Sequence, residues 1–191
     1  MFTLSDHWVE QARHLPSPNA GERPDPGDIS LIIVHNISLP PGEFGGGHVD
    51  ALFTNRLDTS AHPYFEQLQG VEVSSHFLID RAGGVTQYVA CNRRAWHAGR
   101  SAWCGREECN DFAIGIELEG ADDIAYEAAQ YVTLAELAAV LQRAYGMAGD
   151  AVTGHEDVAP GRKTDPGPAF DWPRFWRELA DRRRPQGERR A

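Results

Sequence analysis

The hydrophobic pattern predicts strands that alternate with helices along one chain. Residues 29–34 are rich in apolar and β-branched side chains, which is typical of a central strand covered on both faces, although this pattern alone does not exclude a helix. His35 follows at its carboxyl end. Residues 112–120, FAIGIELEG, predict a second apolar strand that presents Glu117 near its end. Small residues alternate with isoleucines there, which indicates close packing on one face.

Further elements follow from turn residues and helical spacing. Residues 76–89 predict a hairpin with strands near 76–80 and 85–89 and a turn at 82–84. A short helix is expected within residues 49–57, after a glycine-rich loop.

Two longer helices are predicted in the second half of the chain. One covers residues 133–146, where Thr133 and Glu136 have the spacing of a capping box and a glycine ends the helix. The other covers residues 170–183, with Asp171 as the expected N-cap. Its inward-facing residues are expected to be Phe175, Trp176 and Leu179.

These elements predict a single α/β domain with a central mixed β-sheet flanked by α-helices. Residues 15–28 are rich in proline, glycine and charge and are expected to be irregular. The 191 residues suit one domain, which we place at residues 1–180, followed by a basic, mobile tail at 181–191.

Charge argues against a nucleic-acid partner. The net charge is -10, yet the last ten residues hold five of the 18 basic side chains and one of the 28 acidic ones. The remainder is therefore strongly acidic and repels phosphate backbones. A small-molecule substrate fits better, and nothing in the sequence indicates an obligate protein partner.

The three cysteines, Cys91, Cys104 and Cys109, are an odd number without CxxC spacing, so neither a disulfide framework nor a zinc knuckle is expected. The amino-terminal residues lack the basic start and apolar run of an export signal, and no segment approaches 18 apolar residues. We therefore expect a cytoplasmic protein that does not enter the membrane.

Two of the eight histidines are candidates for metal chemistry. His35 ends an apolar strand, where α/β sheets bind ligands. His155 opens a turn-rich loop, TGHEDVAPGRKTDPG, ten residues before Asp165. Two imidazoles and one carboxylate form a common catalytic zinc set that leaves a position for water. Other side chains compete for these places: Glu156 and Asp157 as the acid, and His76 as an imidazole.

Two charged residues would complete such a site. Lys163 lies two residues from Asp165 and could place a cation where negative charge develops on a substrate oxygen. Glu117 would be a general base if it lay beside a metal-bound water. Taken singly, each is equally consistent with an ordinary structural or solvated side chain.

Several long motifs together resemble a known family. The segments LIIVHNISLPPGEFGG, RAWHAG, CNDFAIGIELEG, TGH and APGRKTDPGPAFDW are similar, in the same order, to those of the AmpD family of 1,6-anhydro-N-acetylmuramyl-L-alanine amidases. The similarity runs from about residue 8 to about residue 177. The resemblance implies the fold shared by amidases and peptidoglycan recognition proteins and a role in cell-wall recycling, which would limit the muropeptide signals for β-lactamase induction.

The resemblance also implies roles for individual residues. One Zn²⁺ would be bound by His35, His155 and Asp165, with Glu117 and Lys163 as the catalytic pair. Zinc lowers the pKa of a bound water from about 15.7 to about 7. Glu117 would accept the proton as hydroxide attacks the lactyl carbonyl of the muramyl group, and would return it to the amine of L-alanine.

The same family positions suggest that Asn36 and Trp96 bind substrate, with Trp96 as an apolar platform. His97 is expected either to bind substrate as well or to make a structural hydrogen bond. In two places the chain departs from the family: Glu72 and Glu108 stand where arginines suit acidic stem peptides. These acids would weaken such contacts if the two positions face the ligand.

Competing functions make different predictions. An envelope amidase acting on intact peptidoglycan would need an export signal, and a non-hydrolytic peptidoglycan-binding module would typically lack a zinc ligand. A zinc-stabilised interaction protein would unfold when the metal is removed. The glycine loop at residues 45–47 is a further hypothesis, as a gate to the substrate groove.

Overall fold

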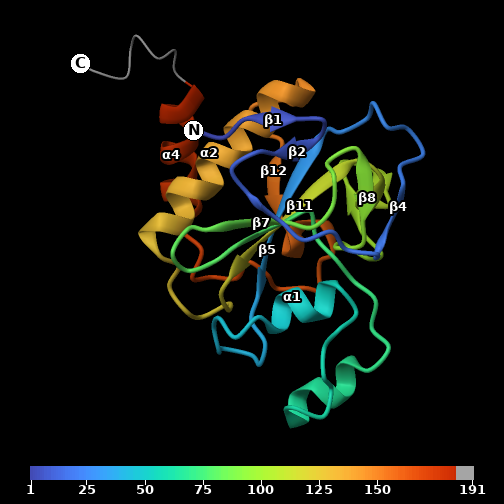
Figure 1. Cartoon of the computed structure of the whole chain (residues 1–191). Coiled ribbons are helices and arrows are strands. Elements are labelled where there is room, and N and C mark those ends of the chain that lie inside the picture. The colour runs from blue at the N-terminus through green and yellow to red at the C-terminus, as the bar shows by residue number, and fades with distance from the viewer. Residues whose placement is uncertain (184–191) are drawn as a thin grey trace.

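The computed structural model describes residues 1–183 and is built on one central sheet of six strands (Figure 1). In spatial order these are β12 (Val152–Gly154), β5 (Leu31–Ile37), β11 (Ala113–Glu119), β6 (Phe77–Ile79), β7 (Val85–Gln87) and β3 (Arg13–His14). The β6–β7 pair is antiparallel and the other pairs are parallel. The predicted mixed sheet with flanking helices is therefore confirmed.

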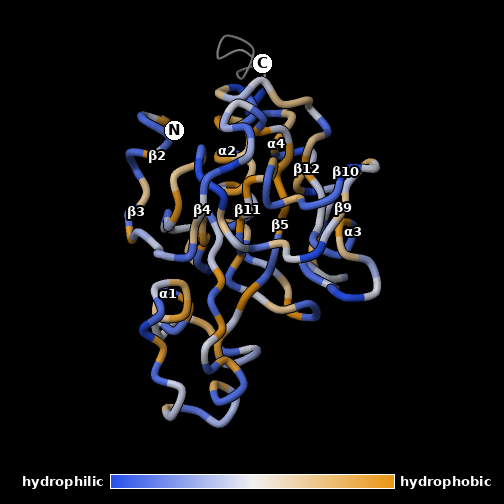
Figure 2. Tube along the Cα trace, turned by 90° about the vertical axis from the view of Figure 1, so that its right-hand side faces the viewer, coloured by the Kyte–Doolittle hydropathy of each residue, from blue (hydrophilic) through white to orange (hydrophobic). Residues whose placement is uncertain are grey.

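The two long central strands account for the apolar runs in the sequence. β11 is buried over its whole length, and β5 is buried from Leu31 to His35. Figure 2 shows hydrophobic colour along both strands in the middle of the molecule. β5 continues two residues beyond His35, so this histidine lies near the end of the strand and not at its last position.

The predicted hairpin is also confirmed, with Phe77 opposite Gln87 in the register of β6 and β7. Its turn is organised by Asp80, whose Oδ1 accepts hydrogen bonds from the backbone N–H groups of Ala82 and Gly84 at 2.9 and 2.8 Å. This pattern is the local side-chain bonding that makes aspartate a turn residue.

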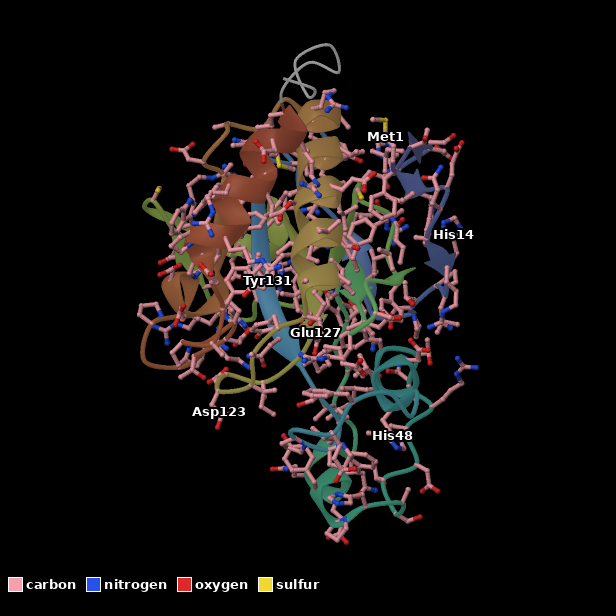
Figure 3. All side chains as sticks on the ribbon, turned by 90° about the vertical axis from the view of Figure 1, so that its left-hand side faces the viewer. Met1, His14, His48, Asp123, Glu127 and Tyr131 are labelled. Carbon is pink, nitrogen blue, oxygen red and sulfur yellow. The ribbon has the colours of Figure 1, made fainter. Side chains whose placement is uncertain are left out.

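Two helices, α2 (Ala128–Tyr145) and α4 (Trp172–Arg183), lie side by side over one face of the sheet, with Tyr131 on α2 in Figure 3. The predicted start of α2 is wrong by five residues. Gln130 accepts a hydrogen bond from the Glu127 backbone N–H at 3.0 Å, while Thr133 donates to the Gly83 carbonyl. The helix extends upstream because the residues there also face the core.

The predicted N-cap of α4 is confirmed, because Asp171 Oδ1 accepts the N–H of Arg174 at 2.9 Å. Phe175 and Leu179 are fully buried, and Trp176 is partly buried against the same core. None of the helices within residues 1–183 combines the length and the apolar character needed to cross a bilayer.

Residues 38–75, which we call the arm, project below the sheet in Figure 1. The arm contains α1 (His48–Phe53) and the 3-10 helix η1 (Pro63–Leu68). Its buried side chains, such as Phe53 and Phe65, form one hydrophobic cluster with residues outside the arm, such as Leu78 and Tyr88. Its glycine loop is tied to the sheet, because the Gly45 N–H donates to the buried Glu119 carboxylate at 2.5 Å. Gating by this loop stays a prediction.

Short elements complete the fold. They are β1 (Leu4–Ser5) with β2 (Trp8–Val9), β4 (Ala20–Glu22) with β8 (Arg93–Ala95), β9 (Ala102–Trp103) with β10 (Arg106–Glu107), the 3-10 helix η2 (Cys109–Asp111) and α3 (His155–Val158). The segment 15–28, expected to be irregular throughout, contributes β4. Residues 184–191, most of the predicted tail, lie outside the described residues, whereas 181–183 belong to α4.

Candidate metal centre and active site

Three neighbouring parallel strands end at one edge of the sheet and bring the predicted residues together. His35 on β5 lies opposite Glu117 on β11 in the register, and His155 directly follows β12 as the first residue of α3. Ligand sites in α/β proteins lie beyond the carboxyl ends of parallel strands. The order of the strands therefore explains how residues 120 positions apart in the chain meet.

Asp165 reaches the same point through the loop that follows α3. The backbone N–H of Glu156 donates to the carbonyl of Asp165 at 2.9 Å, which closes the loop onto its own beginning. The N–H groups of Arg162 and Lys163 both donate to the Ala159 carbonyl at 3.1 Å and form the turn between the two ends. The Asp165 side chain is thereby directed back at His155.

The three side chains converge on one point. The Nδ1 atoms of His35 and His155 are 2.9 Å apart, and each lies 3.0 Å from Oδ2 of Asp165. Both imidazoles are almost completely buried, and the carboxylate is 14% exposed. Each residue can offer one ligand atom to a single metal ion.

The tautomers of the two histidines leave lone pairs that could bind a cation. His155 Nε2 lies 3.1 Å from the carbonyl oxygen of Ala98, so this nitrogen must carry the proton and Nδ1 of the neutral ring carries a lone pair. His35 Nε2 lies 2.9 Å from Nδ1 of His97, and donation there leaves a lone pair on His35 Nδ1 as well. Two lone pairs then face a carboxylate, the donor set of a catalytic zinc site.

The electrostatics agree with this assignment. Burial lowers the pKa of His35 to about 4, so its ring is neutral at pH 7. The His35 ring can therefore offer a lone pair to a cation held beside Asp165.

Glu117 lies beside these ligands without a fixed partner. Its carboxylate is buried, and Oε2 accepts no hydrogen bond from the part of the chain that the structure describes. Burial, followed by the negative charge of Asp165, raises the pKa of Glu117 well above its ordinary value, while Lys163 opposes the shift. A carboxyl group with a raised pKa is suited to proton transfer near neutral pH.

A cleft of about 490 Å³ opens onto this cluster. The lining includes the metal-binding candidates, Glu117 and Lys163, and all three predicted substrate residues, Asn36, Trp96 and His97. The arm contributes an apolar wall, made of Leu39, Leu52, Phe53, Leu68, Val71 and Val73. One end of the cleft is thus polar and charged and the other is apolar.

The amide of Asn36 is already engaged. Its Nδ2 donates to Asp122 Oδ1 at 2.8 Å and to the Pro166 carbonyl at 3.2 Å. Asp122 also lines the cleft, and no motif or spacing in the sequence marks it as part of the site. Asn36 therefore holds the segment next to Asp165 in place.

His97 packs behind His35. Its ring lies against Gly115, where an added Cβ would come within 2.5 Å of the imidazole. This contact is the close packing that the small residues of β11 predicted. His97 is half-buried, and its inaccessible Nε2 atom has no hydrogen-bond partner within residues 1–183.

The competing ligand candidates have other roles. His76 Nδ1 accepts the N–H of Gly115 at 3.1 Å, and Nε2 lies 3.0 Å from the Arg93 carbonyl, which uses both ring nitrogens. Asp157 Oδ2 accepts from the hydroxyl of Thr153 and the N–H of Gly154 at the start of α3. Neither His76, Asp157 nor Glu156 lines the cleft.

The two departures from the family pattern also lie away from the cleft lining. Glu108 is 3.4 Å from the guanidinium of Arg94, and Glu72 borders a separate small cavity beside the arm. Neither Glu72 nor Glu108 lines this cleft, so neither acid is placed to weaken contacts with a stem peptide bound in it.

Comparison with known proteins identifies the family. Residues 25–168 match the family model described as N-acetylmuramoyl-L-alanine amidase. This chain belongs to that family. It is an amidase.

Similar proteins cover nearly the whole chain. The 1,6-anhydro-N-acetylmuramyl-L-alanine amidase AmpD of Salmonella typhimurium (strain SL1344) is 56% identical over 168 residues, 88% of this chain and 90% of that protein. A crystal structure of a Se-Met AmpD derivative has a TM-score of 0.91 at 53% identity and covers 93% of this chain and 99% of the other.

A more distant structure contains a ligand. It is the E. coli amidase AmiD in complex with the substrate anhydro-N-acetylmuramic acid-L-Ala-D-gamma-Glu-L-Lys, with a TM-score of 0.58 and 29% identity. The match covers 79% of this chain and 57% of that one. The fold is therefore shared with amidases whose sequences differ widely.

Proposed function

We propose that this enzyme hydrolyses the amide bond between the lactyl group of 1,6-anhydro-N-acetylmuramic acid and the L-alanine of the stem peptide, as a zinc-dependent amidase of cytoplasmic cell-wall recycling. The observation that carries this proposal is the convergence of two imidazole lone pairs and one carboxylate beside the unpartnered Glu117. The names of the similar AmpD proteins and the ligand bound to AmiD support the substrate.

His35, His155 and Asp165 would hold the zinc ion. When bound, zinc would act as a Lewis acid that polarises the scissile carbonyl and acidifies water. The carbonyl of Ala98 and the imidazole of His97 would orient the two histidine rings from behind, since each lies within hydrogen-bond distance of a ring nitrogen that faces away from the metal.

Glu117 would move the proton. The oxygen of the attacking water forms a bond to the lactyl carbonyl carbon while Glu117 takes the proton, and the carbonyl oxygen becomes an oxyanion that Lys163 stabilises. The C–N bond then breaks as Glu117 passes the proton to the departing nitrogen of L-alanine. The products are a free lactyl carboxylate and a free amine.

The cleft would place the substrate by its two unlike ends. Trp96 and the apolar wall of the arm offer a platform for the sugar, while the charged end receives the amide. We propose that Asn36 and His97 act on the substrate through the groups that they hold in place. We further propose that limiting muropeptide signals for β-lactamase induction is a consequence of this reaction, and the free thiols of Cys91, Cys104 and Cys109 suit a reducing compartment.

The test is a mass-spectrometric comparison of two substrates. The purified protein acts on anhydro-muramyl-tripeptide and on the same peptide attached to ordinary muramic acid. Release of peptide from the anhydro form alone, abolished by a chelator and restored by zinc, is the expected result. Release from both would favour an envelope amidase instead. Release from neither by zinc-loaded protein would contradict the proposed reaction and favour a binding module.

A further inference from the structure

The carbonyl group of Ala98 accepts hydrogen bonds from two sides. His155 Nε2 lies 3.1 Å from this oxygen, and Nη2 of Arg162 lies 2.6 Å from it. A carbonyl oxygen has two lone pairs, so both donors can be satisfied at once. Arg162 is therefore linked through a single oxygen atom to an imidazole that we propose as a zinc ligand.

The guanidinium of Arg162 bridges two turns of the chain. The same Nη2 lies 2.7 Å from the carbonyl of Arg100, so Arg162 holds residues 98 and 100 together. Gly99 stands between them with φ +57, and a Cβ there would lie 3.4 Å from Arg162 Nη1. A glycine at this place permits both the left-handed backbone and the close approach of the guanidinium.

The backbone N–H of Ala98 is held as well. Asn110 Oδ1 accepts the N–H groups of Ala98 and His97 at 2.8 and 3.2 Å. Within residues 1–183 no carboxylate lies within 4.0 Å of the Arg162 guanidinium, so its donors are directed at carbonyl oxygens and not at an ion-pair partner. Ala98 is thus held through its N–H by Asn110 and through its carbonyl oxygen by Arg162.

We propose that Arg162 is a positioning residue for the metal centre, which fixes the Ala98 carbonyl so that His155 keeps its proton on Nε2 and its lone pair on Nδ1. This inference rests on the proposed zinc site. Groups that orient a metal-bound histidine are worth about 10–100-fold in metal affinity or activity. Arg162 acts indirectly, by holding the Ala98 carbonyl oxygen that accepts the hydrogen bond of His155 Nε2.

The experiment compares three variants of the full chain with the wild type. Arg162→Met removes the bridge, and Arg162→Lys keeps the charge but replaces the planar fork by a single ammonium group that cannot hold both carbonyls in the same way. Arg100→Met is the matched control, because it removes a neighbouring arginine side chain from the same loop. Within residues 1–183 the side chain of Arg100 makes no hydrogen bond, and only its backbone carbonyl contacts Arg162. The zinc dissociation constant is measured by competition with a chromophoric chelator.

We expect zinc binding to weaken about 10-fold or more in Arg162→Met, with Arg162→Lys between it and the wild type, and to be unchanged in Arg100→Met. Nitrogen NMR of the imidazoles in the metal-free protein supplies a second readout. His155 should be the Nε2-protonated tautomer in the wild type and a mixture of tautomers in Arg162→Met, a change that a general loss of stability does not produce.

The outcomes separate the two proposals. A wild-type protein that binds no zinc contradicts the metal centre itself. A wild type that binds zinc, together with wild-type affinity and an unchanged tautomer in Arg162→Met, overturns the role of Arg162 alone. If Arg162→Met does not fold, Arg162→Lys decides: wild-type affinity and tautomer in that variant overturn the proposal, and an equal loss in Arg100→Met does so as well.

Discussion

Two sites with buried histidine differ in which groups the ring nitrogens face. His76 directly precedes β6, and both of its ring nitrogens face backbone groups: Nε2 faces the carbonyl oxygen of Arg93, and Nδ1 accepts the N–H of Gly115. At the edge of the sheet, the Nδ1 atoms of His35 and His155 face each other and a carboxylate. Burial lowers the pKa in both places, to about 3 for His76 and about 4 for His35. Burial therefore does not distinguish a ligand from a structural histidine, whereas the direction of the lone pairs does.

His97 lies between these two sites. Its ring centroid is 5.0 Å from that of His35 and 5.7 Å from that of His76, with both pairs edge to face. The candidate metal site therefore packs against His97, which in turn packs against His76, a histidine held by backbone groups. Changes at the candidate metal site and at His76 should have different consequences.

The largest effect is expected from the candidate metal ligands. Asp165→Ala or His35→Ala should abolish stoichiometric zinc binding and reduce amidase activity to background, because only two ligands remain. His76→Gln is the comparison variant, and it should retain one zinc per chain because no ligand is removed. Elemental analysis of the purified proteins decides the matter, and a full zinc complement in either ligand variant would show that the assignment is wrong.

The next effect separates chemistry from metal binding. Glu117→Gln keeps the shape of the side chain but cannot accept the proton, so turnover should fall by about 10²–10⁴-fold while zinc stays bound. Turnover and zinc content are measured on the same preparation. A rate close to that of the wild type would require a different base.

The third effect concerns the packing of His97 against Gly115. Gly115→Ala would place a methyl group within 2.5 Å of the His97 ring, which should cost about 1–3 kcal/mol of stability. Urea denaturation measures this loss. If the ring is the cause, the same substitution in a His97→Ala background should cost much less, and equal costs in both backgrounds would place the strain elsewhere.

The strands that bring the candidate metal ligands together follow from the sequence more readily than the groups that hold those ligands in place. The apolar runs that became β5 and β11, and the ligand candidates at their ends, follow from local pattern and from the rule for parallel strands. The choice of Asp165 over Asp157 did not follow, since it depends on a loop that closes through backbone hydrogen bonds. The role of the Ala98 carbonyl has no sequence pattern at all, because every residue carries a carbonyl group.

Errors in the predicted elements have similar causes. The start of α2 was placed at Thr133 because a capping pattern occurs there, but buried side chains upstream, such as Gln130 and Tyr131, extend the helix to Ala128. Gln130 donates to the carbonyls of Ile79 and Glu119, contacts that connect distant segments and leave no periodic pattern. Local propensity was overridden by tertiary packing.

The smallest effect is a difference in pH dependence that isolates His76. Burial, followed by the positive charge of Arg23, lowers the pKa of His76 from its ordinary value of 6.5 to about 3. Between these values the unfolded chain binds a proton that the folded chain does not. The stability supplied by the neutral ring is therefore complete above pH 6.5 and declines as the pH falls, by at most about 1.4 kcal/mol per pH unit.

Glutamine at position 76 cannot titrate in this range, so the difference in stability between the metal-free wild type and His76→Gln should change as the pH is lowered from 7.5 to 4.5. Comparing the two proteins removes the contributions of His35 and His97, which both retain. Urea denaturation at several pH values gives the two curves. A difference that is constant with pH would mean that His76 is as easily protonated in the folded chain as in the unfolded one. The contrast between the two histidine sites would then rest on hydrogen-bond geometry alone.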